Sequence, residues 1–164
     1  MEKIKERSLL YLWLPQVLVV PAALLGVLLA LIPVLGWILG AALIIAPIVF
    51  SIVYNFYFYY QLSLDVDAVC EGDGYQSKSY LYVLALNSIT FGIYKRYWIY
   101  RMAQRLQANA PRYGFKMMVG GREMVVLDIL STGWISAWEF VRNMNKIAKV
   151  YNQQGLPTFE GGVQ

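Results

Sequence analysis

An unbroken run without a charged side chain, from Ser8 to Leu62, is the feature that most restricts how this chain folds. A helix needs about 20 apolar residues to cross about 30 Å of hydrocarbon, so the run is long enough for two spans. Pro33 and Gly36 interrupt it near its middle, where proline stops a helix and glycine permits a turn. We therefore predict a transmembrane hairpin over residues 1–62, with spans at roughly 9–31 and 36–58.

The composition favours a membrane protein and excludes most catalytic classes. Of the 164 residues, 59% are hydrophobic and 15% are charged, whereas soluble domains are about 25% charged. The chain has no histidine, which excludes His-based acid–base pairs and His metal sites. Cys70 is the single cysteine, and no phosphate-binding loop or dinucleotide fingerprint is present. We therefore expect no enzyme activity, no cofactor, and no catalytic or metal-binding residues.

Small residues recur at helical spacing in both predicted spans and predict where helices pack. In lipid, helices associate through close backbone approach across small residues. The first span has three such positions and the second has a G-x-x-x-G pair: Ala22, Gly26, Ala30, Gly36 and Gly40. The pattern fits packing of the two spans against each other, and it also fits an interface between copies of the chain.

Residues 63–79 follow the hairpin and are predicted to form a solvated acidic linker. Four carboxylates lie there, at Asp65, Asp67, Glu71 and Asp73, against one positive charge at Lys78. Their spacing lacks the regularly alternating ligands and closing glutamate of an EF-hand calcium loop. A cation site is therefore not expected in this segment.

After the linker the chain repeats itself at a fixed offset. Identical residues recur in the two copies: Leu86 and Leu127, Gly92 and Gly133, Arg101 and Arg142. Each copy consists of a short apolar stretch, a Ser/Thr-x-Gly sequence and a basic, aromatic helix. Because repeats fix architecture, we predict a tandem-repeat membrane domain over residues 80–152, with helix breaks at Gly92 and Gly133.

The helix after each break is amphipathic and basic, which is typical of helices that lie in a membrane interface. Apolar stripes are expected to enter the acyl boundary, with Trp98, Ile99, Met102 and Leu106 in the first helix and Phe140, Met144, Ile147 and Tyr151 in the second. The opposite faces carry the residues predicted to contact anionic lipid headgroups: Arg101, Arg105, Arg142, Lys146 and Lys149. Lipid is a nearer partner for these charges than nucleic acid, which we do not expect to bind.

The distribution of Lys and Arg predicts the topology. Seven of the 14 basic residues lie in residues 95–122, without an acidic residue among them. If the first repeat crossed the membrane once, the basic residues would divide equally between the two sides, against the positive-inside bias. If each repeat dips in and returns, all of them lie with the N-terminus on the cytoplasmic side. We therefore predict an all-α membrane protein with two spans and two re-entrant or interfacial units, and keep four spans as the alternative.

The first repeat also resembles a known family. Thr90-Phe91-Gly92-Ile93-Tyr94, followed by Tyr97-Trp98, Tyr100 and Arg101, resembles the tandem T-x-G-I-Y-x-x-Y-W-x-Y-R signature of an uncharacterised prokaryotic membrane-domain family, a domain of unknown function. The resemblance covers about residues 80–152 and is weaker in the second copy. It implies a bacterial cytoplasmic (inner) membrane and no known activity.

Asp128 and Glu139, in the second repeat, are candidates for a function because ionisable groups at membrane depth often have one. Glu139 has Arg142 three residues later and can pair with it, and Asp128 lies just before the Gly133 break. A structural role is expected for both, with a proton or ion path as the alternative.

These features favour a non-enzymatic scaffold or accessory subunit of a larger membrane complex. The expected partners are membrane lipids and either other membrane-protein subunits or further copies of the chain. The alternative is a small channel or transporter that uses the broken helices at Gly92 and Gly133, as discontinuous helices do in carriers. Residues 153–164 contain glycine and proline without periodicity, and we predict a flexible tail there.

Overall fold

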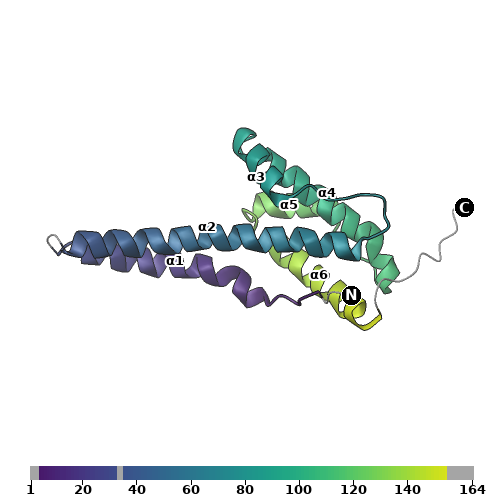
Figure 1. Ribbon diagram of the computed structural model, residues 1–164, viewed down its shortest axis with the longest axis horizontal. Coiled ribbons are helices and arrows are strands. Elements are labelled where there is room, and N and C mark those ends of the chain that lie inside the picture. Colours follow the sequence, from purple (N-terminus) through teal and green to yellow (C-terminus); the bar gives the residue numbers. More distant parts are fainter. Residues whose placement is uncertain (1–3, 33–34, 155–164) are drawn as a thin grey trace, which may run out of the picture. The chain divides into compact units, whose positions relative to one another are not determined.

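The computed structural model describes residues 4–32 and 35–154, which form helices with no β-strand among them (Figure 1). In chain order these are α1 (Leu9–Leu29), α2 (Leu35–Val69), α3 (Tyr80–Ile89), α4 (Ile93–Asn109), the 3-10 helix η1 (Ala110–Tyr113), α5 (Gly121–Leu130) and α6 (Trp134–Gln154). The predicted all-helical class is confirmed. Of the predicted tail, residues 153–154 end α6, and residues 155–164 lie outside the described residues.

The chain divides into two compact units. The apolar unit is Ser8–Tyr59, which holds α1 and the first part of α2. The helical domain consists of Met1–Arg7 together with Tyr60–Gln164, and it holds the end of α2 and all later helices. A short N-terminal segment and the C-terminal two thirds of the chain therefore belong to the same domain.

Two helices, α1 and α2, are long and apolar enough to cross a membrane. The candidate spans are Leu12–Leu29 and Gly36–Val69, with mean hydropathies of 2.2 and 2.4. Large apolar side chains are exposed along both, among them Leu24, Trp37 and Ile52. Exposed apolar surface on this scale marks a site of contact with lipid or another protein.

The small residues singled out in the sequence lie at a close approach of α1 and α2. A Cβ added to Gly40 would lie 2.5 Å from the carbonyl oxygen of Gly26 and 3.3 Å from the Cβ of Ala30. A Cβ added to Gly26 would lie 2.8 Å from the carbonyl oxygen of Gly40. Gly36 is also buried, whereas Ala22 is half-buried. Neither Gly26 nor Gly40 has room for a side chain.

The second helix continues beyond the predicted end of the hairpin. Residues 63–69, which the sequence suggested were linker, form the last two turns of α2. Val66 and Val69 are fully buried and Ser63 is 4% exposed, so this end of the helix belongs to the core. Two aspartates interspersed among the apolar residues obscure the helical periodicity there, and only the segment after Val69 is a linker.

The two repeats adopt the same helix–break–helix structure. Gly92 and Gly133 both have a φ of 91°, in the left-handed region, and the residues before them, Phe91 and Thr132, have φ of 49° and 51°. Glycine tolerates this region because it lacks a Cβ. In both copies the hydroxyl of the Ser/Thr before the break also accepts a hydrogen bond from the first turn of the next helix, at 3.0 Å for Thr90 and at 2.9 Å for its counterpart. The sequence repeat is therefore a structural repeat.

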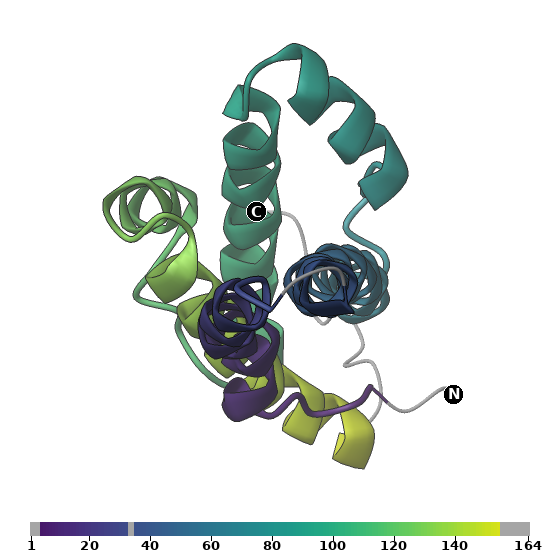
Figure 2. The same ribbon diagram turned by 90° about the vertical axis from the view of Figure 1, so that its left-hand side faces the viewer.

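Both breaks lie at one end of the antiparallel pair α4 and α5 (Figures 1 and 2). Arg96, in the first turn of α4, lies 3.7 Å from Asp128, near the end of α5. Further along, Gly121 at the start of α5 approaches the backbone of Tyr100 so closely that an added Cβ would lie 2.7 Å from its carbonyl oxygen. The core of the domain is formed by the end of α2 with α4, α5 and α6, in side chains that are each at most 2% exposed: Val66, Val69, Met102, Leu106, Met124, Met144 and Ile147.

We expect Gly40→Val to destabilise the protein by about 1–3 kcal/mol, because the new side chain meets the Gly26 backbone and an overpacked site must shift. Thermal unfolding of the full-length protein in mild detergent, followed by circular dichroism, measures the effect. Ala41→Val is the matched control, since Ala41 is the next residue along α2 and is exposed. Equal unfolding temperatures for the two variants would contradict the close packing.

Candidate functional site

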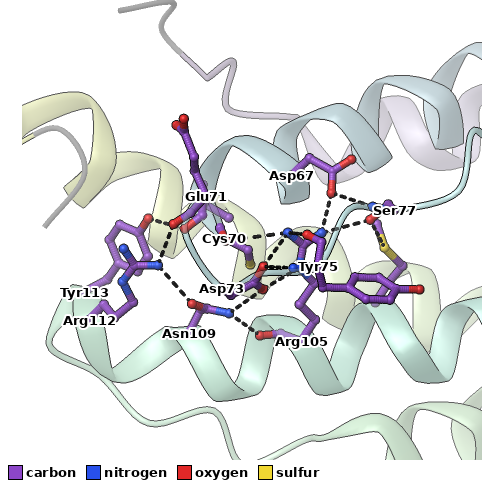
Figure 3. Close-up of polar contacts among 12 residues, drawn as sticks. Asp67, Cys70, Glu71, Asp73, Tyr75, Ser77, Arg105, Asn109, Arg112 and Tyr113 are labelled. Carbon is purple, nitrogen blue, oxygen red and sulfur yellow. Dashed lines mark hydrogen bonds and ion pairs between the residues drawn. The ribbon is translucent and has the colours of Figure 1, made fainter. Parts of the chain in front are cut away.

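A buried arginine organises the polar centre of the helical domain (Figure 3). The side chain of Arg105, on α4, is 8% exposed. Its guanidinium binds the carboxylate of Asp73 through Nε and Nη2, at 2.6 and 2.9 Å, and also forms an ion pair with Asp67. It donates further hydrogen bonds to the hydroxyl of Ser77, at 3.0 Å, and to the carbonyl of Tyr75. Arg105 therefore holds the whole loop after α2.

Neighbouring side chains of α4 and η1 complete this arginine clamp. Asn109 donates to Asp73 Oδ2 at 3.2 Å, and Arg112 donates to the carbonyl of Glu71 at 3.1 Å. The hydroxyl of Tyr113 donates to the carbonyl of Val69. The last carbonyls of a helix have no partner within the helix, so these donors stabilise the end of α2.

Burial and charge set the protonation of the groups in the clamp. Burial raises the pKa of the Asp73 carboxyl, but the hydrogen bonds and charge of Arg105, together with hydrogen bonds from the Tyr75 N–H and Asn109, outweigh it and bring the pKa below its ordinary value. Burial raises the pKa of the Cys70 thiol to about 12. The thiolate is the reactive form of cysteine. Cys70 stays a protonated thiol at neutral pH and is therefore a poor nucleophile. No group of three or more Cys, Asp or Glu residues in the described part of the chain is arranged to hold a metal ion.

The clamp corrects two predictions. The acidic segment is not a solvated linker, because Asp67 and Asp73 neutralise a buried cation. Arg105 is not available to lipid headgroups, because its side chain is buried among these partners. Its position on the polar side of the helical pattern suggested exposure, but the chain supplies a covering loop that periodicity does not reveal.

The other predicted lipid-facing residues differ in their surroundings. Arg101 is half-buried, with its guanidinium 5.0 Å from the centre of the Tyr75 ring. On α6, Arg142 lies 3.5 Å from Glu139 and Lys149 lies 3.8 Å from Glu6, and both basic side chains are more than half exposed. Lys146 is exposed and has no ion pair with the residues described. The α6 residues thus form an exposed basic face, whereas the α4 residues do not.

The apolar stripes of α4 and α6 belong to the protein core. Trp98, Ile99, Met102 and Leu106 are all at most 6% exposed. The same is true of the α6 stripe, where Phe140, Met144, Ile147 and Tyr151 are at most 7% exposed. The prediction that these stripes enter the acyl boundary is therefore wrong. A stripe that faces other helices has the same periodicity as one that faces lipid, so sequence alone does not distinguish them.

Exposed apolar side chains gather instead around the two helix breaks. Phe91, in the first break, is 95% exposed, and Leu130, before the second, is 78% exposed. With their neighbours they form what we term the break tips: Ile89, Phe91, Ile93, Leu130, Trp134 and Ile135, each at least 41% exposed. Because the breaks lie at one end of the α4/α5 pair, the domain has one apolar end.

Asp128 and Glu139 both have partners, which favours their structural interpretation. Asp128 accepts a hydrogen bond from the hydroxyl of Ser136 at 3.0 Å and faces Arg96. Glu139 accepts a hydrogen bond from the side chain of Asn143 at 3.1 Å, in addition to its ion pair with Arg142.

Sequence reasoning missed two asparagines on α6 that bind the N-terminal segment. Asn152 and Asn145 form hydrogen bonds with the backbones of Ile4 and Arg7. The side chain of Arg7 also forms an ion pair with Asp65. The sequence does show asparagines two helical turns apart, but it shows no sign that a segment 138 or 148 positions away would cover them.

The fold and the clamp define an all-helical protein with two helices long and apolar enough to cross a membrane, joined to a domain of two helix–break–helix repeats. The family model described as Domain of unknown function (DUF4234) matches the chain twice, over residues 38–108 and 78–149. Together the matches cover more than half of the chain, which therefore belongs to this family. No curated protein and no solved structure matches it.

The two family matches are staggered by nearly the same interval as the sequence repeat, since they begin at positions 38 and 78 and end at positions 108 and 149. The two matches overlap on α3 and α4. In the first match these helices follow α2, whereas in the second match they come first. At the repeat offset α2 carries identical residues, with Phe50, Ile52 and Tyr59 in the places of Phe91, Ile93 and Tyr100. The first family match therefore begins within α2, at residue 38, which sequence reasoning had not anticipated.

We expect Arg105→Gln to lower the stability of the protein by about 3–5 kcal/mol, because it leaves two carboxylates without their buried counter-charge. The loop should then loosen, and Cys70, which is fully buried, should become accessible. Unfolding in mild detergent measures the first effect, and the rate of Cys70 labelling by a maleimide measures the second. Arg122→Gln, at an exposed position on α5, should change stability by less than about 0.5 kcal/mol. Wild-type stability and labelling in Arg105→Gln would refute the role of the clamp.

Proposed function

We propose that this chain is a two-span protein of the bacterial inner membrane, whose helical domain lies at the cytoplasmic surface as a non-enzymatic scaffold or accessory subunit of a larger membrane complex. The observation that carries this proposal is the arginine clamp, since it restricts how often the chain crosses the bilayer. The contacts of the N-terminal segment, the break tips and the pairing of charged groups give further support.

The clamp favours two spans over four. In a four-span arrangement the chain would cross the membrane between the loop after α2 and the second half of α4. Arg105 would then lie on the opposite side of the membrane from Asp67 and Asp73, yet it pairs directly with both. Helix α3 has 10 residues, or about 15 Å at 1.5 Å per residue, which is about half of the hydrocarbon thickness. A first repeat that enters the membrane only part of the way and returns to the same side satisfies both observations.

The N-terminal segment supports an even number of crossings between the two ends of the chain. Ile4 and Arg7 hydrogen-bond to α6, so the start of the chain and its last helix lie on the same side. Helices α1 and α2 provide two crossings and return the chain to its starting side. The cytoplasmic assignment follows from the positive-inside rule, because all the basic residues then share one face.

The break tips supply the contact with lipid that we first assigned to the stripes of α4 and α6. Exposure of six apolar side chains to water at one end of the domain is unfavourable in free energy. Apolar side chains of this kind insert about 5–10 Å into a membrane interface. Trp138 and Tyr97, both about half exposed, follow the tips by a turn, as aromatic residues do at headgroup level. The exposed basic face of α6 then lies where anionic headgroups attract it, by about 1 kcal/mol per charge.

The chemistry of the domain supports a scaffold rather than an enzyme. Arg105, Asp128 and Glu139 are all engaged in internal pairs, and the Cys70 thiol is buried. The channel or transporter alternative uses the broken helices, but the polar groups at each break hydrogen-bond locally rather than face a path. A scaffold requires only surfaces, and the domain has an apolar end and a basic face.

Reporter fusions in the full chain after Gly74, after Arg122 and at Gln164 should all report the cytoplasm. The expectation follows because two spans return the chain to the side of its N-terminus and neither repeat crosses. A reporter inserted between α1 and α2, after Pro33, is the control and should report the opposite side. A fusion after Arg122 that reports the far side would establish four spans.

Extraction of the native membrane in mild detergent should yield the chain in a particle with other membrane subunits at fixed stoichiometry. A scaffold has no activity of its own, so reconstituted vesicles that hold the purified chain alone should show no ion flux above empty vesicles. Quantitative mass spectrometry of the particle and a fluorescent flux assay measure the two outcomes. A particle that contains only this chain and conducts ions would replace the scaffold by the channel.

A further inference from the structure

The N-terminal segment is bound to α6 as a peptide ligand would be. The side-chain amide of Asn152 accepts a hydrogen bond from the N–H of Ile4 at 2.9 Å and donates to its carbonyl at 2.8 Å. Asn145 pairs in the same way with the N–H and carbonyl of Arg7, at 2.9 and 2.7 Å. Four hydrogen bonds thus bind the main chain of two residues, and these bonds do not depend on the side chains of Ile4 and Arg7. We call Asn145 and Asn152 the asparagine ladder.

The spacing of the ladder fits an extended segment. Seven residues of helix rise about 10.5 Å, and three residues of extended chain cover about 10 Å. The segment runs antiparallel to α6, since Ile4 meets Asn152 and Arg7 meets Asn145. Any extended backbone with free N–H and carbonyl groups three residues apart satisfies the same four hydrogen bonds.

Side chains add selectivity to this main-chain recognition. Ile4 is 5% exposed, so an apolar side chain is buried at the first position. Three residues later the guanidinium of Arg7 pairs with Asp65 on α2, and both side chains are less than one fifth exposed. Between them Lys5 and Glu6 are exposed, and Glu6 forms only a solvent-exposed ion pair with Lys149 on α6, at 3.8 Å. The pattern that the site recognises is therefore apolar-x-x-Arg.

We propose that the asparagine ladder, together with Asp65, is a docking site for an extended apolar-x-x-Arg segment of a partner protein, and that the chain's own Ile4–Arg7 segment occupies it until the partner arrives. That a partner exists rests on the proposed scaffold role. The sequence pattern that the site binds is inferred from the chain's own bound segment. Four hydrogen bonds, one buried side chain and two ion pairs, of which the Glu6–Lys149 pair is exposed, form a small contact. Its occupancy in the free protein depends on the high effective concentration of a tethered segment, so a partner segment with additional contacts displaces it.

The experiment uses the full-length protein in mild detergent and a fluorescent peptide with the sequence of residues 2–8. In the Ile4→Asp variant the chain's own segment carries a charge at the buried position and should leave the site. By fluorescence polarisation the peptide should bind this variant at least tenfold more tightly than wild type, because an occupied site weakens apparent affinity. Adding Asn145→Ala and Asn152→Ala should abolish binding. Gln153→Ala, an exposed amide next to the ladder, should leave it unchanged.

A second measurement does not depend on the Ile4→Asp variant. A spin label on Lys5→Cys reports the mobility of the bound segment, and Cys70 is too deeply buried to compete for the label. Excess unlabelled peptide should convert the immobile signal to a mobile one, and a peptide with alanine in place of Arg7 should be at least tenfold less effective. In the Asn145→Ala, Asn152→Ala background the label should be mobile without peptide.

The proposal is overturned if the peptide neither binds the opened variant nor mobilises the label, or if the ladder substitutions leave binding intact. Label mobility that changes with protein concentration alone would identify a second copy of the chain as the occupant, and would also overturn the assignment to a partner protein. Because these measurements are made in detergent, they do not depend on membrane topology. Reporter fusions that contradict the two-span arrangement would reject the proposed function without affecting the docking site.

Discussion

A guanidinium removed from water requires counter-charges, and the helical domain is arranged around this requirement at Arg105. Desolvation of an unpaired ion costs several kcal/mol, so α4 can bury Arg105 only if the loop after α2 folds back over it. Asp73 approaches from that loop and Asp67 from the last turn of α2, so the end of α2 is held in the same contact. One side chain thus connects the end of a long apolar helix to the repeats, and the remaining donors of α4 and η1 add to the same contact.

The repeats show how a single residue type decides whether a helix continues. Gly92 and Gly133 adopt a left-handed conformation that ends one helix and begins another. At the repeat offset in α2 the residue is Ser51, and the helix runs through it without a break. A side chain makes the left-handed region costly by about 1–2 kcal/mol per residue. Glycine at this position therefore accompanies the two breaks, whereas serine stands in a continuous helix.

Local rules predicted much of this fold, whereas tertiary pairing determined the site. The uncharged run predicted two long apolar helices, and the Ser/Thr-x-Gly sequences located both breaks, because these features depend on neighbouring residues. The burial of Arg105, the ordering of the acidic loop and the asparagine ladder depend on residues 28 to 148 positions apart. The apolar stripes of α4 and α6 have the right periodicity for either lipid or protein, and only the other helices of the domain decide between them.

The distribution of polarity in the helical domain follows from these contacts. Because α4 and α6 bury their apolar stripes in the core of the domain, the apolar side chains at the breaks are left exposed at the helix ends. The charged groups at the opposite end are used internally, in the arginine clamp and in the pairing of Arg7 with Asp65. The domain is thus apolar at one end and internally neutralised at the other. Its charged surface is the exposed basic face of α6, beside the asparagine ladder that the chain's own Ile4–Arg7 segment occupies.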